Sequence, residues 1–418
     1  MQSGNLSMSL RERALAAMLG LGTSSRYLLL GLYRRGELRD QKGRLRQLGL
    51  VLLKPVTSWR RADAFVRRHG EALREQYGVS PLRQRLVLAW AAFRYSARPD
   101  PGVAYWAFAV QRPRKWNCWI GDVQSFVLNG DLNARCAPRT AHRINDKREF
   151  AEWAREFGVP DVPVIAALEA GRWEGGGLDA LARTLPDADL FAKPADGGRG
   201  IGARRWLRIA PGRWRDRDGA EVTAGEIVAA VGKDSGIRPM ILQRALHPHP
   251  AVAALAPNAV STVRFVTYED SRGEPRALRA SLRLPAPDAI VDNAHAGGMF
   301  ASIDLETGRL GKVIRRRPDG LLEPHAELNA RPGIAETLVA LWPSVLALAL
   351  DAQRAAAPVP FLGWDVALST EGPILLEGNN MWDGCLVTLS HEVPLGETPF
   401  PEEFLRHWFA GNREAATR

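Results

Sequence analysis

The chain has 418 residues, of which 46% are hydrophobic and 24% are charged, and its formal net charge is +10. This length accommodates two or three globular domains, and the composition is neither that of a disordered chain nor that of collagen. The best candidate for a membrane span, Ala14 to Leu32, is interrupted by Arg26 and by Gly20 and Gly22. No apolar run reaches the roughly 20 residues that a span requires, so we do not expect an integral membrane protein.

The positive charge is concentrated near the N-terminus. Residues 1–115 contain 22 Lys and Arg against 7 Asp and Glu, whereas residues 116–418 contain 34 against 39. This imbalance suggests an anionic partner for the N-terminal region, an anionic membrane surface or polymer rather than nucleic acid. The other interpretation, which we favour from the sequence, is a solvated helical face without a partner.

The cysteines carry a further prediction. Cys118, Cys136 and Cys385 form no CxxC pair, which argues against a disulfide scaffold or a zinc site. A reducing, cytoplasmic setting therefore fits best. The basic N-terminal region adds the expectation that the protein lies at the inner face of the membrane.

In chain order, residues 1–135 are expected to be basic and mainly helical, since apolar residues recur at helical spacing, for example over 59–77. The character of the sequence changes after residue 135. Asn145 and Asp146 there offer a cap for a new helix. Thr223, followed by Glu226 three residues later, has the spacing of a capping box.

Strand patterns dominate the rest of the chain. Short strands are expected over 162–166, 190–194, 204–209, 240–245, 261–268, 278–284 and 299–304. A helical stretch over 335–355 is expected to bend or break at Pro343, and Phe361 to Asn379 is predicted to form a closing hairpin. This mixed order favours an α+β fold over a doubly wound parallel sheet. We predict three parts, with bounds 1–135, 136–245 and 246–418.

The hairpin holds the sharpest chemical signal. If its pairing centres on Glu371, Asp365 lies opposite Glu377, and Asn379 shares a face with Glu377. Two facing carboxylates repel one another, but a divalent cation between them removes the cost. Carboxylate and amide oxygens suit Mg²⁺. The alternative is that one of the carboxylates pairs with an arginine.

A lysine and a glycine-rich loop give the second signal. Lys193 ends an apolar strand, and a loop with glycines at 197, 198, 200 and 202 follows it. Glycines let backbone amides approach phosphate oxygens, and lysine supplies a point charge. Because the lysine precedes the glycines, this is not a Walker A loop, and a glycine-rich turn without a ligand is the alternative. Lys147, one of only seven lysines, follows the predicted cap.

Basic residues on two strands give the third signal. Arg279, Ser281 and Arg283 alternate with apolar residues, and Arg264 lies on the preceding strand. Guanidinium groups near a phosphate loop would stabilise a transferring phosphoryl group. Solvated strand faces are the alternative.

Taken together, these motifs resemble the ATP-grasp superfamily, and most closely the sugar-transfer-associated ATP-grasp family. The resemblance covers about residues 140–390 and rests on ordered motifs. They are Asn145-Asp146-Lys147, Lys193-Pro194, Ser261-Thr262-Val263-Arg264, Asp292-Asn293, Gly297-Gly298, Gly363-Trp364-Asp365-Val366-Ala367 and Glu377-Gly378-Asn379. The chain differs from many relatives in carrying a glycine at position 378.

The resemblance implies two α+β subdomains that grasp ATP, preceded by the helical N-terminal region. It implies phosphate binding by Lys147, Lys193 and the loop of Gly197, Gly198, Gly200 and Gly202, with Gln243 at the adenine end. It implies that Asp365, Glu377 and Asn379 hold Mg²⁺ and that Arg264 and Arg283 are catalytic at the γ-phosphate. By similarity to the ribosomal-protein glutamate ligases, it implies substrate binding by Asn293, Gly297 and Gly298.

The expected function is that of an ADP-forming ligase that uses ATP and Mg²⁺ to join a carboxylate to an amine through an acyl phosphate. The family hints at cell-envelope or saccharide-related biosynthesis, with small-molecule or saccharide-linked substrates. Two alternatives stay open. One is a phosphotransferase that stops after phosphorylation, and the other is a non-catalytic nucleotide-binding module of polysaccharide assembly.

Overall fold

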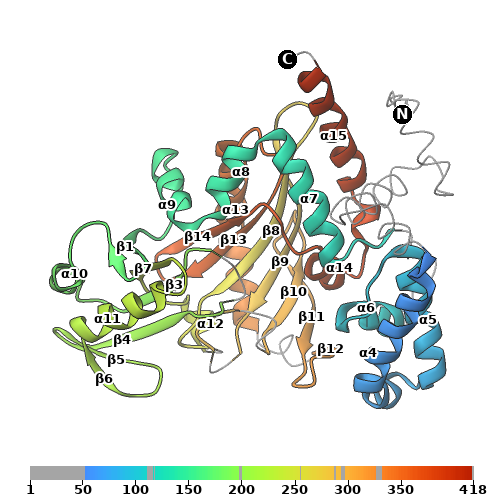
Figure 1. Ribbon diagram of the computed structural model, residues 1–418, viewed down its shortest axis with the longest axis horizontal. Helices are drawn as coiled ribbons and strands as arrows, with labels where there is room; N and C mark the ends of the chain where they lie inside the picture. Colours follow the sequence, from blue (N-terminus) through green and yellow to red (C-terminus); the bar gives the residue numbers. More distant parts are fainter. Residues whose placement is uncertain are drawn as a thin grey trace.

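The computed structural model describes residues 52–110, 116, 118–196, 200–254, 256–286, 289–292, 297–325 and 332–416. Two seven-stranded sheets organise this part of the chain (Figure 1). Every pairing between their strands is antiparallel. The α+β class predicted from the sequence is therefore confirmed.

The first sheet has the strand order β2-β1-β7-β3-β4-β5-β6. Its strands are β1 (Val164–Glu169), β2 (Arg172–Trp173), β3 (Leu190–Pro194), β4 (Arg204–Ala210), β5 (Arg213–Arg215), β6 (Glu221–Thr223) and β7 (Met240–Arg244). Helices α10 (Leu178–Thr184) and α11 (Ala224–Ser235) pack on it and close a core that includes Trp206, Trp214 and Ile227.

The second sheet has the order β12-β11-β10-β9-β8-β13-β14. Its strands are β8 (Ser261–Glu269), β9 (Pro275–Leu284), β10 (Met299–Ile303), β11 (Leu310–Arg316), β12 (Leu322–Pro324), β13 (Phe361–Ser369) and β14 (Gly372–Asn379). The short helix α12 (Pro250–Ala253) precedes it. Each strand that the sequence predicts overlaps an observed one, whereas β2, β5, β6, β11 and β12 are additional.

Helices cover both faces of the second sheet. Helix α13 (Pro332–Ala355) packs on one face together with α9 (Lys147–Glu156). The other face is covered by α7 (Asp122–Cys136), α14 (Gly384–His391) and α15 (Phe400–Ala416). The short 3-10 helix Leu395–Glu397 belongs to this layer, whereas Ile144 of α8 (Pro138–Asn145) is part of the core formed with α9 and α13.

The described N-terminal residues are helical. They form α4 (Lys54–Tyr77), α5 (Pro81–Tyr95), α6 (Pro101–Tyr105) and a π-helical turn, Trp106–Val110. Their core continues into β10, β11, β12 and α14, so these helices extend one end of the second sheet (Figure 1). The predicted bounds between the three parts of the chain stay predictions.

The sequence predicts how two helices, α9 and α11, begin, but it does not predict the continuous interior of α13. The side chain of Asp146 caps α9 by accepting from the backbone N–H groups of Arg148 and Glu149, and Thr223 with Glu226 forms the expected capping box of α11. Helix α13 continues through Pro343 without a break, and the other expectation, a bend there, stays a prediction. Proline removes one backbone hydrogen bond, and burial of one face of α13 against the sheet offsets that loss.

Among the described helices, residues Gly333–Ala355 of α13 are long and apolar enough to cross a membrane by length and composition. In this fold 33% of that apolar stretch is buried, including Leu338, Val345 and Ala349, which pack against the second sheet. One face of α13 therefore belongs to the core.

Candidate active site

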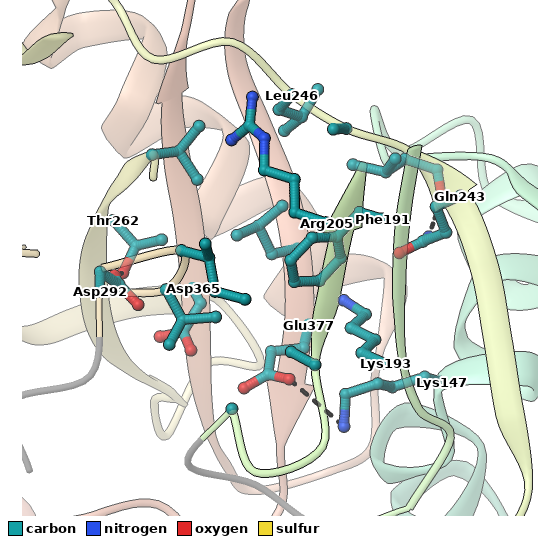
Figure 2. A pocket seen from close by; sticks show the side chains of 18 of the residues that line it. Lys147, Phe191, Lys193, Arg205, Gln243, Leu246, Thr262, Asp292, Asp365 and Glu377 are labelled. Atoms are coloured by element: carbon teal, nitrogen blue, oxygen red, sulfur yellow. Dashed lines mark hydrogen bonds and ion pairs between the residues drawn. The ribbon is translucent and has the colours of Figure 1, made fainter. Parts of the chain in front are cut away.

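A cleft of about 150 Å³ lies between the two sheets and is lined by charged side chains from both (Figure 2). The first sheet contributes Phe191 and Lys193 of β3, Arg205 of β4 and Gln243 of β7. The second sheet contributes Thr262 of β8, Arg283 of β9, Asp365 of β13 and Glu377 of β14. Seven of the site residues predicted from the sequence therefore line this cleft. They are Lys147, Lys193, Gly200, Gln243, Arg283, Asp365 and Glu377.

The hairpin of β13 and β14 places Asp365 opposite Glu377, as the sequence predicts. The strand register that forms this pair contains a bulge that the sequence does not predict. From the turn, the strands pair in simple succession as far as Val366 opposite Leu375, and a bulge at Leu376 then brings Glu377 opposite Asp365. A bulge re-aims the side chains that follow it. Without the bulge, Leu376 would face Asp365.

Asp365 lies between two arginines of neighbouring strands. Arg264, its cross-strand neighbour on β8, donates from Nε to Oδ1 and from Nη2 to Oδ2, the second bond measuring 2.8 Å. Arg283 of β9 donates from Nη1 to Oδ2 at 3.0 Å. Burial raises the pKa of Asp365, but the two guanidiniums outweigh burial and hold the pKa well below its usual range.

This network corrects the expectation of two unbalanced carboxylates in the hairpin. The arginine pairing that the sequence left as an alternative is present at Asp365, and it engages both arginines. Arg283 lines the cleft, whereas Arg264 does not. The strand face that carries Arg279, Ser281 and Arg283 is buried rather than solvated, and Arg279 donates to two backbone carbonyls near α14.

Sequence reasoning assigned no role to Asp292, although it noted the Asp292-Asn293 motif. Arg283 donates from Nη2 to Oδ1 of Asp292 at 2.8 Å, and the Thr262 hydroxyl donates to the other carboxylate oxygen. Burial raises the pKa of Asp292, whereas Arg283 opposes that shift. Because Asp292 and Asp365 hold Arg283 from two sides, the direction of its guanidinium is fixed at the cleft surface.

Two lysines approach Glu377 from the opposite wall (Figure 2). Nζ of Lys147, the first residue of α9, lies 3.5 Å from Oε2 of Glu377. Lys193 lies beside it on β3, and burial lowers the pKa of Lys193 to about 8 although Glu377 opposes the shift. Two lysines, one from α9 and one from β3 of the first sheet, therefore face a carboxylate of the second sheet across the cleft.

The glycine loop after β3 is described in part. Gly197 and Gly198 lie outside the described residues, while Gly200 lines the cleft with a φ of +66°. A Cβ atom on Gly200 would come within 2.7 Å of the Val291 side chain, so only glycine allows this approach to the opposite wall. Gly202 also has a positive φ, of +82°, and does not line the cleft.

At the far end of the cleft, Gln243 donates from Nε2 to the carbonyl of Val162 at 2.5 Å. Phe191 lies next to it on β3, and Arg205 lies opposite Phe191 on β4. Arg205 is buried, and its Nε has no hydrogen-bond partner among the described residues. Sequence reasoning missed Arg205, although side-chain alternation along 204–209 turns one member of the Arg204-Arg205 pair inward.

The predicted substrate-binding residues are not brought together with the others. Asn293 lies outside the described residues. Gly297 and Gly298 precede β10 and do not line the cleft. Their assignment stays a prediction.

The oxygens of the hairpin fit a magnesium ion shared with a nucleotide. Over the described ranges, no group of three or more His, Cys, Asp or Glu side chains is placed to hold a metal. Glu377 lines the cleft, whereas Asn379, which projects from the same face of β14, does not. The amide nitrogen of Asn379 is buried without a hydrogen-bond partner among the described residues. Turning that amide over would place an unpartnered oxygen there. Because Mg²⁺ is commonly held by one or two carboxylates plus phosphate oxygens, this donor set fits it once phosphates complete the shell.

Comparisons with solved structures find remote likenesses. The D-alanine-D-alanine ligase from Coxiella burnetii is 12% identical over 71% of this chain and 70% of its own, with a TM-score of 0.40. The D-alanine-D-alanine ligase from Bacillus anthracis is 11% identical over 71% of this chain and 80% of its own, with a TM-score of 0.39. A D-cycloserine synthetase is 17% identical over 64% and 71%, with a TM-score of 0.34.

No curated protein matches the sequence. A family model described as sugar-transfer associated ATP-grasp matches residues 127–395, which include both sheets and the whole cleft. The two sheets are accordingly the two halves of an ATP-grasp fold. The chain belongs to the sugar-transfer associated ATP-grasp family.

Proposed function

We propose that the protein is an ADP-forming ligase that joins a carboxylate to an amine at the expense of ATP. One observation carries the proposal. Lys147 of α9 and Lys193 of β3 meet the carboxylate of Glu377 of β14 inside one cleft. Cations on one wall and oxygen ligands on the other are what the triphosphate of a magnesium nucleotide requires.

In the first step, an oxygen of the substrate carboxylate would attack the γ-phosphorus of ATP, and the bond to the β-phosphate oxygen would break to release ADP. In the second step, the amine nitrogen would attack the carbonyl carbon of the acyl phosphate. Inorganic phosphate would leave, and the amine would lose a proton. Neither step needs a nucleophilic side chain, so catalysis would consist of positioning and charge neutralisation.

Different residues of the cleft would position the nucleotide and neutralise its charge. Lys147 and Lys193 would bind phosphate oxygens, and Gln243 with Phe191 would border the base. Arg283, held by Asp365 and Asp292, would offer its guanidinium to the transferring phosphoryl group. Bound Mg²⁺ would add neutralisation of phosphate charge, and Asp365, Glu377 and Asn379 are the residues that would hold it.

The test is ATP turnover with a panel of sugar acids, amino acids and amino sugars, with ADP and coupled product both measured. We expect Glu377→Gln to lower Mg-dependent turnover by at least about 100-fold, because it removes a charged oxygen ligand. Glu306→Gln, a change at an exposed carboxyl in the β10–β11 turn, should leave turnover unchanged. An active Glu377→Gln variant would refute the metal role.

The same assay separates the ligase from a phosphotransferase. A ligase accumulates ADP only when both a carboxylate and an amine are present, whereas a phosphotransferase needs one acceptor. ADP release with a single substrate and a stable phosphorylated product would therefore contradict the proposal.

A further inference from the structure

Helix α5 is apolar on two opposite faces. Its inward face packs into the N-terminal core through Leu88, Ala91 and Ala92. A second row of apolar side chains, here named the α5 stripe, consists of Leu82, Leu86, Trp90 and Phe93. These four side chains are 61%, 54%, 46% and 45% exposed. At 100° per residue, the stripe occupies an arc of about 80° on the side opposite the buried face.

The start of α4 adds apolar surface at one end of the stripe. Nζ of Lys54 donates to Oγ of Ser96 at 2.9 Å, so the start of α4 lies beside the end of α5. Leu53, Val56 and Trp59, all exposed, cluster there. A soluble monomer exposes apolar side chains singly, and a contiguous row with tryptophans marks an interaction surface.

The charges around this surface are positive and largely uncompensated. Residues 52–96 contain nine Lys and Arg against three Asp and Glu. Arg60, Arg61 and Arg83 are exposed and form no ion pair within the described part of the chain. Residues 1–51, which lead directly into this surface, add nine basic residues against three acidic ones.

We propose that the α5 stripe and the start of α4 dock the protein on the surface of an anionic phospholipid bilayer, with α5 lying in the plane of the interface. Leucine, phenylalanine and tryptophan on one side of a helix, with arginines beside them, is the composition of interfacial helices. Tryptophan rings settle at the headgroup level, and arginine stems cover apolar surface while their heads reach lipid phosphates.

The position of α5 leaves the rest of the molecule free. Helices α4 and α5 lie at one end of the molecule, whereas the first sheet lies toward the other (Figure 1). Phe191, Lys193 and Arg205 of that sheet line the cleft. Docking would therefore hold the cleft near the membrane surface without covering it. This proposal does not depend on the ligase chemistry.

The test is flotation of the full-length protein with phosphatidylcholine vesicles that contain or lack phosphatidylglycerol. We expect flotation with the anionic vesicles, weakened by salt, and little with neutral ones. The double variant Leu86→Ser/Trp90→Ser should partition at least about tenfold less. Arg60→Gln and Arg61→Gln should each reduce partition by about fivefold.

The matched control is Ile237→Ser, since Ile237 follows α11 and is 86% exposed. It should float like the wild type, and all variants should bind an ATP analogue equally. Hydrogen exchange in α5 of the wild type should slow only when anionic vesicles are present.

Three results would overturn the proposal. The first is a wild type that does not float with anionic vesicles. The second is flotation without any change in α5 exchange, or flotation of the double variant at the wild-type level. The third is a wild type that is dimeric without vesicles and becomes monomeric in the double variant, because a second copy would then cover the stripe.

Discussion

At the scale of single residues, Asp365 balances the positive charge of two arginines on neighbouring strands of the second sheet. It accepts hydrogen bonds from Arg264 and Arg283, and Arg283 is held on its other side by Asp292. A buried ion pair contributes little against an apolar replacement, but removing one partner leaves an uncompensated buried charge. The value of Asp365 therefore lies in the two arginines that it neutralises.

Replacing Asp365 by asparagine should lower the free energy of unfolding by about 3–5 kcal/mol, because two guanidiniums lose their counter-charge. Chemical denaturation near neutral pH measures this change. Asp351→Asn is the control, since the Asp351–Arg354 pair on α13 is exposed, and it should change stability by less than about 1 kcal/mol. Equal effects of the two substitutions would show that Asp365 does not balance buried charge.

At the scale of elements, the β13–β14 hairpin explains why this chain carries glycine at position 378. Trp364 lies opposite Gly378, and a Cβ atom there would come within 2.6 Å of the Trp364 ring and 2.3 Å of Ile144. The ring of Trp364 fills the space that a side chain at 378 would need. Glycine at position 378 therefore makes room for the side chains of Trp364 and Ile144.

Gly378→Ala should accordingly destabilise the protein by about 1–3 kcal/mol through overpacking. Because the substitution is next to Glu377, it should also lower ATP turnover. Gly225→Ala in α11 is the control, as nothing lies within 4 Å of the added atom, and there alanine should stabilise by about 0.5–1 kcal/mol. Thermal or chemical unfolding of both variants decides the point, and a neutral Gly378→Ala would contradict this packing account.

The start of α14 gives a pH prediction. Asp122 and Asp383 both accept from the backbone N–H of Cys385, at 2.9 and 2.7 Å. Burial, together with the carboxylate of Asp383, raises the pKa of Asp122 well above its usual value, and burial raises the pKa of Asp100 to about 6. Both groups keep a proton in the folded state that the unfolded chain releases near pH 4.

The stabilisation from these two protons is complete below about pH 4 and is lost as the pH rises through the folded-state values. Asp122→Asn, which cannot ionise, should therefore gain stability relative to the wild type between pH 5 and pH 8. Unfolding free energies at the two pH values measure the difference. If the difference in unfolding free energy between the variant and the wild type is the same at pH 5 and pH 8, Asp122 is ionised in the folded protein at both pH values, and the prediction is contradicted.

The hairpin also marks the limit of what the sequence predicts. Two apolar runs around a Gly-Pro turn were sufficient to predict β13, β14 and the facing carboxylates. The bulge at Leu376 was not predictable, because it accompanies a contact with a distant segment, in which the N–H of Leu375 donates to the carbonyl of Pro160 at 2.9 Å. Likewise, the pairing of Asp365 with two arginines requires the strand order β9-β8-β13, which local patterns do not encode.

At the scale of the whole molecule, ordered motifs predicted the family and fold more reliably than periodicity predicted single elements. Helix α13 is unbroken at Pro343, and the strands β2, β5, β6, β11 and β12 were not predicted. Lys147, Lys193, Asp365 and Glu377 nevertheless meet in one cleft, because each lies on a regular element whose type the sequence does encode. The parts of the cleft that were missed, Arg205 and Asp292, are buried polar residues whose hydrogen-bond partners lie between 9 and 53 residues away, on other strands and loops.

The two halves of the fold contribute opposite charges to the cleft, so binding of a magnesium nucleotide between them is the central claim. Calorimetric titration of the full-length protein with a nonhydrolysable ATP analogue, with and without Mg²⁺, tests it most directly. We predict saturable binding that Mg²⁺ strengthens and that Lys193→Met weakens by at least about tenfold, through loss of a charged contact to phosphate. Absence of binding by a folded sample in the presence of Mg²⁺ would contradict the claim.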